Sequence, residues 1–362
     1  MQIKKINLLN LNKKNLKKFF LSIGETAFRA NQVMKWIYHD YCNDFNKMTN
    51  ISKKLKKKLN SLAEIYAPKI INTLYSSDGT IKWIMQTKSQ KTETIYIPEK
   101  KRNTLCISSQ IGCILKCTFC ASGQQKFQRN LTISEIIGQI WRIKKIFHKK
   151  IEKNIKHYRK ITNIVIMGIG EPLLNIKNII PAINIMLDDL GFGISKRKIT
   201  ISTSGIPSAI EKLSHKTDVV LALSLHAPTD KIRNKIMPIN KKYNINSCLS
   251  SIYNYLKTSK ANKGKITIEY VMLQNINDNI QHAHQLAKLL KKIPCKINLI
   301  PWNQIPGSYY QCSSNIQINN FFNILKKYNL IVTIRKTRGN DIHASCGQLT
   351  GKNKKIIHKL NI

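Results

Sequence analysis

The sequence has few acidic residues. Only 18 of its 362 residues are Asp or Glu, whereas 61 are Lys or Arg, so the formal net charge is +43. Lys, Asn and Ile are abundant, a bias typical of AT-rich genomes, and some lysines are therefore solvated filler. Such drift does not by itself deplete acidic residues so far. The imbalance favours a polyanionic partner, and we predict nucleic acid.

The sequence also lacks long apolar runs. None reaches the roughly 18–20 residues of a membrane span. The first residues, from Met1 to Asn7, contain no continuous apolar stretch of the kind found in signal peptides. We therefore expect a cytoplasmic protein without membrane association. In a reducing cytosol, we expect its nine cysteines to serve as metal ligands or reactive groups rather than to form structural disulfides.

Three of the nine cysteines fall within eight residues. Cys113, Cys117 and Cys120 have the spacing C-x3-C-x2-C. Thiolates hold iron–sulfur clusters, and three of them can bind three irons of a [4Fe–4S] cubane while the fourth iron stays open. A structural zinc site needs four ligands, usually in two spaced pairs, and no second C-x2-C pair is present. The spacing favours a cluster over zinc and over three unrelated buried cysteines.

The hydrophobic period divides the chain. Residues 1–65 show the 3.6-residue period of helices, with Ser52 placed as an N-cap. Residues 66–100 indicate three strands and a charged joint. In residues 101–350 apolar strands alternate with helices, which is typical of a parallel sheet covered on both faces. About six such units predict a partial (β/α)6 barrel of the α/β class, with its chemistry at the carboxyl ends of the strands. Residues 351–362 are a basic tail.

The first helix of the predicted barrel has a clear start and an indistinct end. A capping box, Thr132 to Glu135, precedes it, and its apolar period ends at Phe147. The polar and basic residues 148–160 are expected to form a loop or insertion.

Polar residues follow several predicted strands at their carboxyl ends. At such a strand end, glycine lets a ligand approach the backbone closely, and a carboxylate can accept a hydrogen bond from an ammonium group. Each residue alone is also explained by an ordinary strand-terminating turn, but together they outline one pocket. With the neighbouring Gly170 and Leu225 included, the candidate residues at these strand ends are Gly170, Glu171, Ser202, Ser224, Leu225, His226 and Asn303.

Two further cysteines stand out by their context. Cys106 lies seven residues before Cys113, on the strand that leads into the cluster motif, and Cys346 lies in a glycine-flanked polar loop near the C-terminus. A lone cysteine is most often a buried core residue, and that alternative applies to Cys106. The same assignment is made for the four cysteines without a motif, namely Cys42, Cys248, Cys295 and Cys312.

These motifs resemble a known family. The spacing C-x3-C-x-aromatic-C, with Phe119 as the aromatic residue, is similar to the signature of radical S-adenosylmethionine (SAM) enzymes. Within that superfamily the chain resembles the RlmN family of RNA methyltransferases, from about Phe28 to Gln348. The resemblance is carried by four segments: Leu105–Cys113, Met167–Leu173, Ser224–Ala227 and the loop around Cys346.

The resemblance implies two cofactors. One [4Fe–4S] cluster per chain would be held by Cys113, Cys117 and Cys120, and its open iron would chelate SAM. The strand-end residues from Gly170 to Asn303 would bind SAM. Flavodoxin or a ferredoxin system would donate electrons to a monomeric enzyme.

The resemblance also implies a reaction. The enzyme would methylate carbon 2 of adenine in 23S rRNA and in some tRNAs, consuming two SAM per methyl group. Cys346 would carry the methyl group, and Cys106 would release the product and leave a Cys106–Cys346 disulfide. Glu93 matches the family's proton acceptor, although its strand pattern alone indicates a surface residue.

Two alternatives remain at this stage. Methylation at carbon 8 of adenine, as in the related Cfr enzymes, uses the same cysteines and is not separated by the motifs. A basic RNA-binding protein with a structural zinc ion or cluster would bind RNA without turnover.

Overall fold

The computed structural model describes residues 5–88, 90–152 and 159–350. The predicted basic tail, residues 351–362, lies outside the described residues, as do residues 153–158 of the predicted insertion.

One curved sheet runs through most of the described chain. Its ten strands have the order β14-β13-β12-β11-β10-β9-β6-β5-β4-β3, and the seven from β6 to β14 pair in parallel. Each parallel strand lies beside its predecessor in the chain, as in a (β/α) barrel, and the described strands form an open sheet instead of a closed barrel. The predicted partial barrel is confirmed. The parallel strands are β6 (Asn103–Ile107), β9 (Asn163–Ile166), β10 (Ile199–Thr203), β11 (Val220–Ser224), β12 (Ile266–Met272), β13 (Cys295–Pro301) and β14 (Ile331–Ile334).

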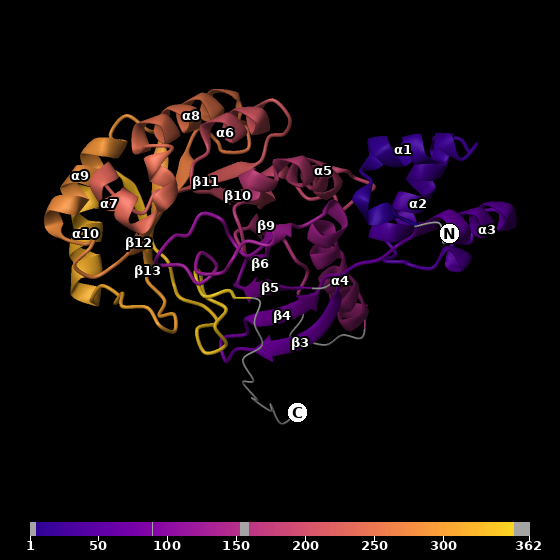
Figure 1. The fold of residues 1–362 in the computed structure, drawn as a ribbon, viewed down its shortest axis with the longest axis horizontal. Helices are drawn as coiled ribbons and strands as arrows, with labels where there is room; N and C mark the ends of the chain where they lie inside the picture. The colour runs from indigo at the N-terminus through magenta and orange to yellow at the C-terminus, as the bar shows by residue number, and fades with distance from the viewer. Residues whose placement is uncertain (1–4, 89, 153–158, 351–362) are drawn as a thin grey trace.

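Helices cover the outer face of the parallel strands (Figure 1). Isoleucine and leucine side chains from both layers form the main core, including Ile164 of β9 and Ile140 of α4. No helix in the described ranges combines the length and apolar character needed to cross a bilayer. The helices are α4 (Ile133–Glu152), α5 (Ile176–Leu187), α6 (Pro207–Ser214), α7 (Asp230–Ile236), α8 (Ile245–Thr258), α9 (Ile280–Leu290) and α10 (Asn315–Lys327).

Helix α4 begins where the capping box predicts but ends later. Thr132 Oγ1 accepts from the Glu135 amide at 3.3 Å, and Glu135 Oε2 accepts from the Thr132 amide at 2.9 Å. The helix continues through His148 to Glu152, so the predicted loop from residue 148 is wrong over these five residues. Lysine and glutamate are good helix formers, and no proline or glycine stops the helix there.

Three antiparallel strands extend the sheet beyond β6: β3 (Lys69–Tyr75), β4 (Ile81–Gln86) and β5 (Lys91–Pro98). Ile95 of β5 pairs with Cys106 of β6, so this β extension borders the strand that leads to the cysteine motif. In Figure 1 the C-terminal segment of the described chain lies beside β3 and β4.

The N-terminal segment forms three helices at one side of the molecule (Figure 1). They are α1 (Lys13–Ser22), α2 (Phe28–Tyr38) and α3 (Lys53–Leu62), and Ser52 caps α3 as predicted by accepting from the Leu55 amide at 3.2 Å. Two short strands, β1 (Ile6–Asn7) and β2 (Ala63–Glu64), were not anticipated. Trp141 of α4 donates to the Ile37 carbonyl at 2.7 Å and joins this segment to the barrel. The division into units at residues 65 and 100 stays a prediction.

Short 3-10 helices complete the described elements. They are η1 (Leu8–Asn10), η2 (Phe45–Lys47), η3 (Pro172–Asn175), η4 (Lys196–Lys198) and η5 (Pro238–Lys241).

Candidate active site

The cysteine motif lies on a loop closed by a small hairpin. Strands β7 (Gln110–Ile111) and β8 (Arg129–Asn130) pair antiparallel and bring residues 112 and 128 together. Inside the loop the Cys120 amide donates to the Cys117 carbonyl at 3.2 Å, and the Gly123 amide donates to the Cys120 carbonyl at 2.9 Å. A Cβ atom at Gly123 would lie 2.6 Å from the Cys117 carbonyl oxygen, so only glycine permits this close approach.

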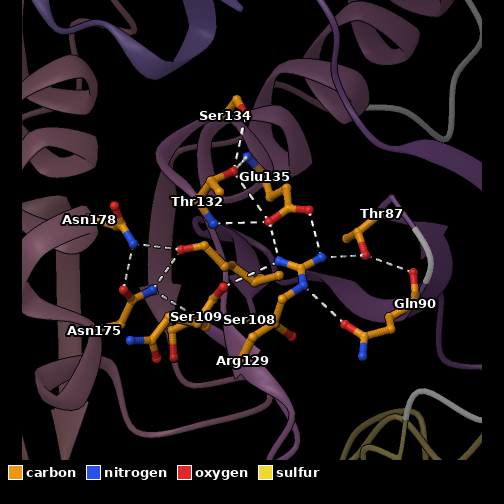
Figure 2. Close-up of polar contacts among 12 residues, drawn as sticks. Thr87, Gln90, Ser108, Ser109, Arg129, Thr132, Ser134, Glu135, Asn175 and Asn178 are labelled. Carbon is orange, nitrogen blue, oxygen red and sulfur yellow. Dashed lines mark hydrogen bonds and ion pairs between the residues drawn. The ribbon is translucent and has the colours of Figure 1, made fainter.

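A bidentate ion pair anchors the base of this loop (Figure 2). Arg129 of β8 donates to both carboxylate oxygens of Glu135 at 2.7 and 2.9 Å, and to Thr87 and Gln90 at 3.1 and 3.0 Å. Burial alone would raise the pKa of Glu135, but the hydrogen bonds from Arg129 and Thr132 outweigh it and lower the pKa. The hairpin is thereby held to both α4 and the β4–β5 turn.

The cysteine loop and the strand ends line one cavity. The three cysteines of the motif border it, and so do all the strand-end residues singled out in the sequence except Leu225. The Leu225 side chain is fully buried in the core instead. The residues from the sequence analysis that border the cavity are Cys113, Cys117, Cys120, Gly170, Glu171, Ser202, Ser224, His226, Asn303 and Cys346.

Glu171 is held by two backbone amides, one in η3 and one directly after β10. Its Oε1 accepts from the Leu173 amide at 3.1 Å, and its Oε2 accepts from the Ser204 amide at 2.8 Å. Burial raises the pKa of Glu171. A carboxylate has about four acceptor positions, so Glu171 retains capacity for a ligand ammonium group. The preceding Gly170 has φ +100°, and a Cβ there would meet the Gln110 side chain at 2.4 Å.

His226 is a neutral imidazole with an assignable tautomer. Its Nδ1 lies 3.1 Å from the Val271 amide and accepts from it, so its proton is on Nε2. Burial, with the nearby charge of Arg233, lowers the pKa of His226 to about 3. The ring packs edge-on against Phe119, with centroids 5.0 Å apart. His226 can therefore donate a hydrogen bond in the cavity but carries no charge near neutral pH.

Arg233 connects the ends of neighbouring strands. It was not identified from the sequence, because no local pattern distinguishes it from the solvated cations. It is completely buried. Its guanidinium donates to the carbonyls of Ser204 at 2.6 Å, Leu225 at 3.0 Å and Ser224 at 3.1 Å. These bonds join the ends of β10 and β11, on which Ser202 and Ser224 lie with their hydroxyls 3.2 Å apart.

Cys346 and Cys106 meet at a second cavity, and Cys346 borders both cavities. The Cys346 carbonyl accepts from Asn303 Nδ2 at 3.1 Å, which ties its loop to the end of β13. Burial raises the pKa of the Cys106 thiol to about 12, and the charge of Arg335 opposes this rise. All nine cysteines are free thiols, so the implied Cys106–Cys346 disulfide is not formed in this structure. In the implied reaction it exists only between product release and reduction.

Arg335 and Glu269 border the same two cavities and were also missed. The pKa of Arg335 is raised, mainly by the charge of Cys346 and to a smaller extent by that of Glu269, so these groups lie close together. Glu269 Oε1 accepts from Asn298 Nδ2 at 3.0 Å, and its Oε2 has no hydrogen-bond partner within the described chain.

Glu93 is not a surface residue. Its side chain is wholly buried on β5, and its Oε1 lies 3.5 Å from the Lys82 ammonium on β4. The alternation of side chains along β5 correctly places Glu93 on one face of the sheet. The loop that contains Cys346 covers that face, so Glu93 is buried instead of exposed.

The donor set fits a cubane cluster. Three thiols on one loop border a cavity together with Glu171, a carboxylate suited to an amino group. Among the described residues, no three His, Cys, Asp or Glu side chains are arranged to hold a single metal ion. A cubane does not require that arrangement, because each thiolate binds a different iron.

The sequence assigns four cysteines without a motif to the core. Cys248 and Cys295 are buried as expected, and Cys42 is half-buried. Cys312 is exposed, so the core assignment is wrong for Cys312.

Comparison with known proteins bears on this site. Residues 6–65 match the family described as "Ribosomal RNA large subunit methyltransferase N-terminal domain", and residues 107–287 match "Radical SAM superfamily". The crystal structure of a radical SAM methyltransferase from Sphaerobacter thermophilus is similar, with 33% identity and a TM-score of 0.88. That match covers 96% of this chain and 100% of the other.

Two other structures share less. A domain of pyruvate-formate lyase-activating enzyme from Bacteroides vulgatus has 18% identity and a TM-score of 0.37, covering 48% of this chain and 99% of that one. SuiB from Streptococcus suis, bound to SAM, has 15% identity and a TM-score of 0.44, covering 67% and 55%. Likenesses this low carry no further argument.

Proposed function

Since the chain belongs to the RlmN family of radical SAM methyltransferases, we propose that it methylates carbon 2 of adenine in 23S rRNA and in some tRNAs through a methyl-cysteine relay. The [4Fe–4S] cluster and SAM come with the superfamily. The observation that carries the proposal is the position of Cys346, which borders both the cavity of the cluster cysteines and the cavity that contains Cys106.

The proposal assigns the cofactors to the first cavity. Cys113, Cys117 and Cys120 hold the cluster, Glu171 accepts from the SAM ammonium group, and Ser202, Ser224, His226 and Asn303 bind the rest of SAM, with Gly170 and Leu225 contributing backbone. When bound, the cluster supplies the electron that splits SAM, and SAM supplies the methyl group and the radical that activates it.

The three remaining residues carry the carbon and the proton. Cys346, as a thiolate, accepts the methyl group. After the methyl carbon is joined to adenine C2, the Cys106 thiolate attacks the sulfur of Cys346. The S–S bond forms, the S–C bond breaks, and its electron pair stays with the carbon, which takes up a proton to become the methyl group. Before that step the radical adduct gives up one electron, which the cluster would accept, and Glu93 accepts the proton that C2 loses. The charge of Arg335 favours the thiolate form of Cys106 and opposes the burial that raises the pKa of that thiol.

The substrate assignment rests on charge and on family. Members of this family act on RNA, and the formal net charge of +43 suits a polyanion. The target adenine must leave its stack to reach the Cys346 sulfur, which borders the two cavities, so loops or single strands are the expected substrates. We further propose that the enzyme works as a cytoplasmic monomer, with flavodoxin or a ferredoxin as electron donor.

Nucleoside analysis tests the proposal. The protein, anaerobically reconstituted with its cluster, is incubated with SAM, a reductant and rRNA fragments or tRNA, and the digested RNA is examined by mass spectrometry. The proposal expects 2-methyladenosine together with 5′-deoxyadenosine. A carbon-8 product would instead identify a Cfr-like enzyme, and RNA binding without 5′-deoxyadenosine would identify a non-catalytic metalloprotein.

A further inference from the structure

Lys82 is a buried cation in the β extension. Only 6% of its side chain is exposed, although lysine is almost never buried without a partner. Its Nζ lies 3.5 Å from Glu93 Oε1 and donates to the His343 carbonyl oxygen at 2.9 Å. One ammonium group therefore connects a carboxylate on β5 with the main chain of the loop that carries Cys346.

The same loop depends on the β extension at two further places. Ser76 Oγ, at the β3–β4 turn, donates to Asp341 Oδ1 at 2.7 Å, and the Gly339 amide donates to Asp78 Oδ2 at 2.9 Å. Apolar residues of the loop, Ile342, Ala344 and Leu349, pack in one buried cluster with Ile95 and Cys106. Residues 338–349, here called the Cys346 loop, thus lie across the face of the sheet on which Lys82 and Glu93 pair.

Stability does not account for this ion pair. Removing an ammonium and a carboxylate from water costs several kcal/mol for each ion, and a well-packed apolar pair of similar volume is often as stable. Most of this face is already apolar, since Ile84, Ile95 and Ile97 surround the pair on the same strands. A charged pair at this place is better explained by a need for a carboxylate that stays ionised.

We propose that Lys82 is a positioning residue that keeps the Glu93 carboxylate ionised and holds it in register with the Cys346 loop. The inference rests on the proposed function, in which Glu93 accepts the proton from adenine C2. In that step the C–H bond breaks, its electron pair stays in the RNA adduct, and the proton neutralises Glu93. Burial alone would favour the protonated form of Glu93, and a protonated carboxyl group cannot accept a proton. The adjacent Lys82 ammonium group favours the ionised carboxylate instead.

The elements around the Lys82–Glu93 pair carry several other ionisable groups. The groups on these elements are Lys82 on β4, Cys106 on β6, and Arg338, Asp341, His343 and Cys346 on the Cys346 loop. Of these groups, the Lys82 ammonium is the cation that forms an ion pair with Glu93, at 3.5 Å. Its removal is expected to raise the pKa of Glu93 and so to move the acid limb of the rate profile to higher pH.

The main experiment compares Lys82→Met with Lys82→Arg and Asp341→Asn in the reconstituted holoenzyme. Single-turnover reactions with RNA are followed between about pH 6 and 9, with separate readouts for 5′-deoxyadenosine, the protein–RNA adduct and the methylated product. K82M is expected to form 5′-deoxyadenosine and adduct but to release product at least about tenfold more slowly at neutral pH, recovering as the pH rises by one unit or more. K82R restores the wild-type profile.

Asp341→Asn is the matched control, because it weakens the same loop without touching Glu93. It is expected to lower product formation equally at every pH. Lys82→Gln, which keeps a donor for the His343 carbonyl, replaces K82M if that variant does not fold, and the same shift is expected. An unshifted acid limb in K82M or K82Q, or an equal shift in D341N, overturns the inference.

A second measurement does not depend on catalysis. Denaturant unfolding is compared for the full chain and for K82M, E93Q and the K82M/E93Q double variant. A coupled pair predicts that the double variant loses less stability than the sum of the single variants, because it leaves no unpaired buried charge. Additive losses contradict the coupling. If the wild type makes no methyladenosine, the proposed function fails, and this cycle still decides whether Lys82 and Glu93 act as a unit.

Discussion

The Ala121 amide donates a hydrogen bond of 2.7 Å to the Gly347 carbonyl oxygen. Ala121 follows the third cysteine of the cluster motif, and Gly347 follows Cys346. Ser122 Oγ adds a second bond of 2.8 Å, to the Leu349 carbonyl. The loop proposed to hold the cluster and the loop proposed to carry the methyl group are therefore joined directly through the main chain. This junction sets the distance between the two parts of the proposed chemistry.

The two relay cysteines are expected to fail in different ways. Cys346→Ala removes the methyl acceptor, so neither 2-methyladenosine nor a protein–RNA adduct should form. Cys106→Ala leaves the acceptor but removes the attacking thiolate, so a covalent adduct should accumulate. Denaturing electrophoresis of labelled RNA, with mass spectrometry of the product, separates these outcomes. The exposed Cys312→Ser is the control and should behave as the wild type. Methylated adenosine from C346A would rule out the relay.

Arg233 is expected to be essential for the strand ends. Arg233→Met leaves the carbonyls of Ser204, Ser224 and Leu225 without their donor in a buried site. Each unsatisfied group costs about 1–3 kcal/mol, so we expect a loss of at least about 3 kcal/mol in the free energy of unfolding. SAM affinity, measured by calorimetry, should fall as well. The exposed Arg197→Met should change stability by less than about 0.5 kcal/mol, and a similar loss in both variants would contradict the assignment.

The folded chain should lose stability in acid partly through His226. Burial lowers its pKa to about 3, well below the ordinary histidine value of about 6.5. Between these values the unfolded chain binds a proton that the folded chain does not. This contribution to stability is complete above about pH 6.5 and decreases by about 1.4 kcal/mol per pH unit as the pH falls toward 3. Urea unfolding from pH 7.5 down to pH 4.5 should give a shallower pH dependence for His226→Gln than for the wild type. Identical slopes would show that His226 titrates normally.

RNA binding should depend steeply on salt. With about six to ten phosphate contacts, affinity would fall roughly 10³–10⁵-fold between about 50 and 200 mM salt. We expect α3 to contribute, because Lys53, Lys54 and Lys57 are exposed along one helix. Replacing all three with Gln should weaken binding and reduce the salt slope by up to about two.

The matched control for this charge change lies at the far end of the barrel. Lys288, Lys291 and Lys292, near the end of α9, are also exposed, and their replacement with Gln removes the same charge. An equal loss of RNA affinity in both triple variants would mean that the net charge acts as a whole and that α3 has no special role. Fluorescence anisotropy with a labelled RNA hairpin measures both.

Local signals in the sequence were sufficient for much of this protein. The cysteine spacing needs only eight residues, the Ser52 cap and the Thr132–Glu135 box need four, and apolar runs mark the parallel strands. Because parallel strands in a barrel end at one rim, Glu171, Ser202 and His226 could be grouped before the fold was known. These inferences succeed because the physics that determines them acts within a turn, a strand or a helix end.

Tertiary structure alone decided the environment of the charged residues. Lys82 and Arg233 are two of 61 cations in a chain where most are solvated, and no local pattern separates them. Glu93 lies on a strand whose alternation assigns it to one face, but only the Cys346 loop, far away in the sequence, makes that face buried. Desolvation depends on what packs above a side chain, and that is settled by long-range contacts. The sequence by itself thus determined the cluster motif and the rim of the barrel, and the tertiary structure decided which charges are buried there and paired.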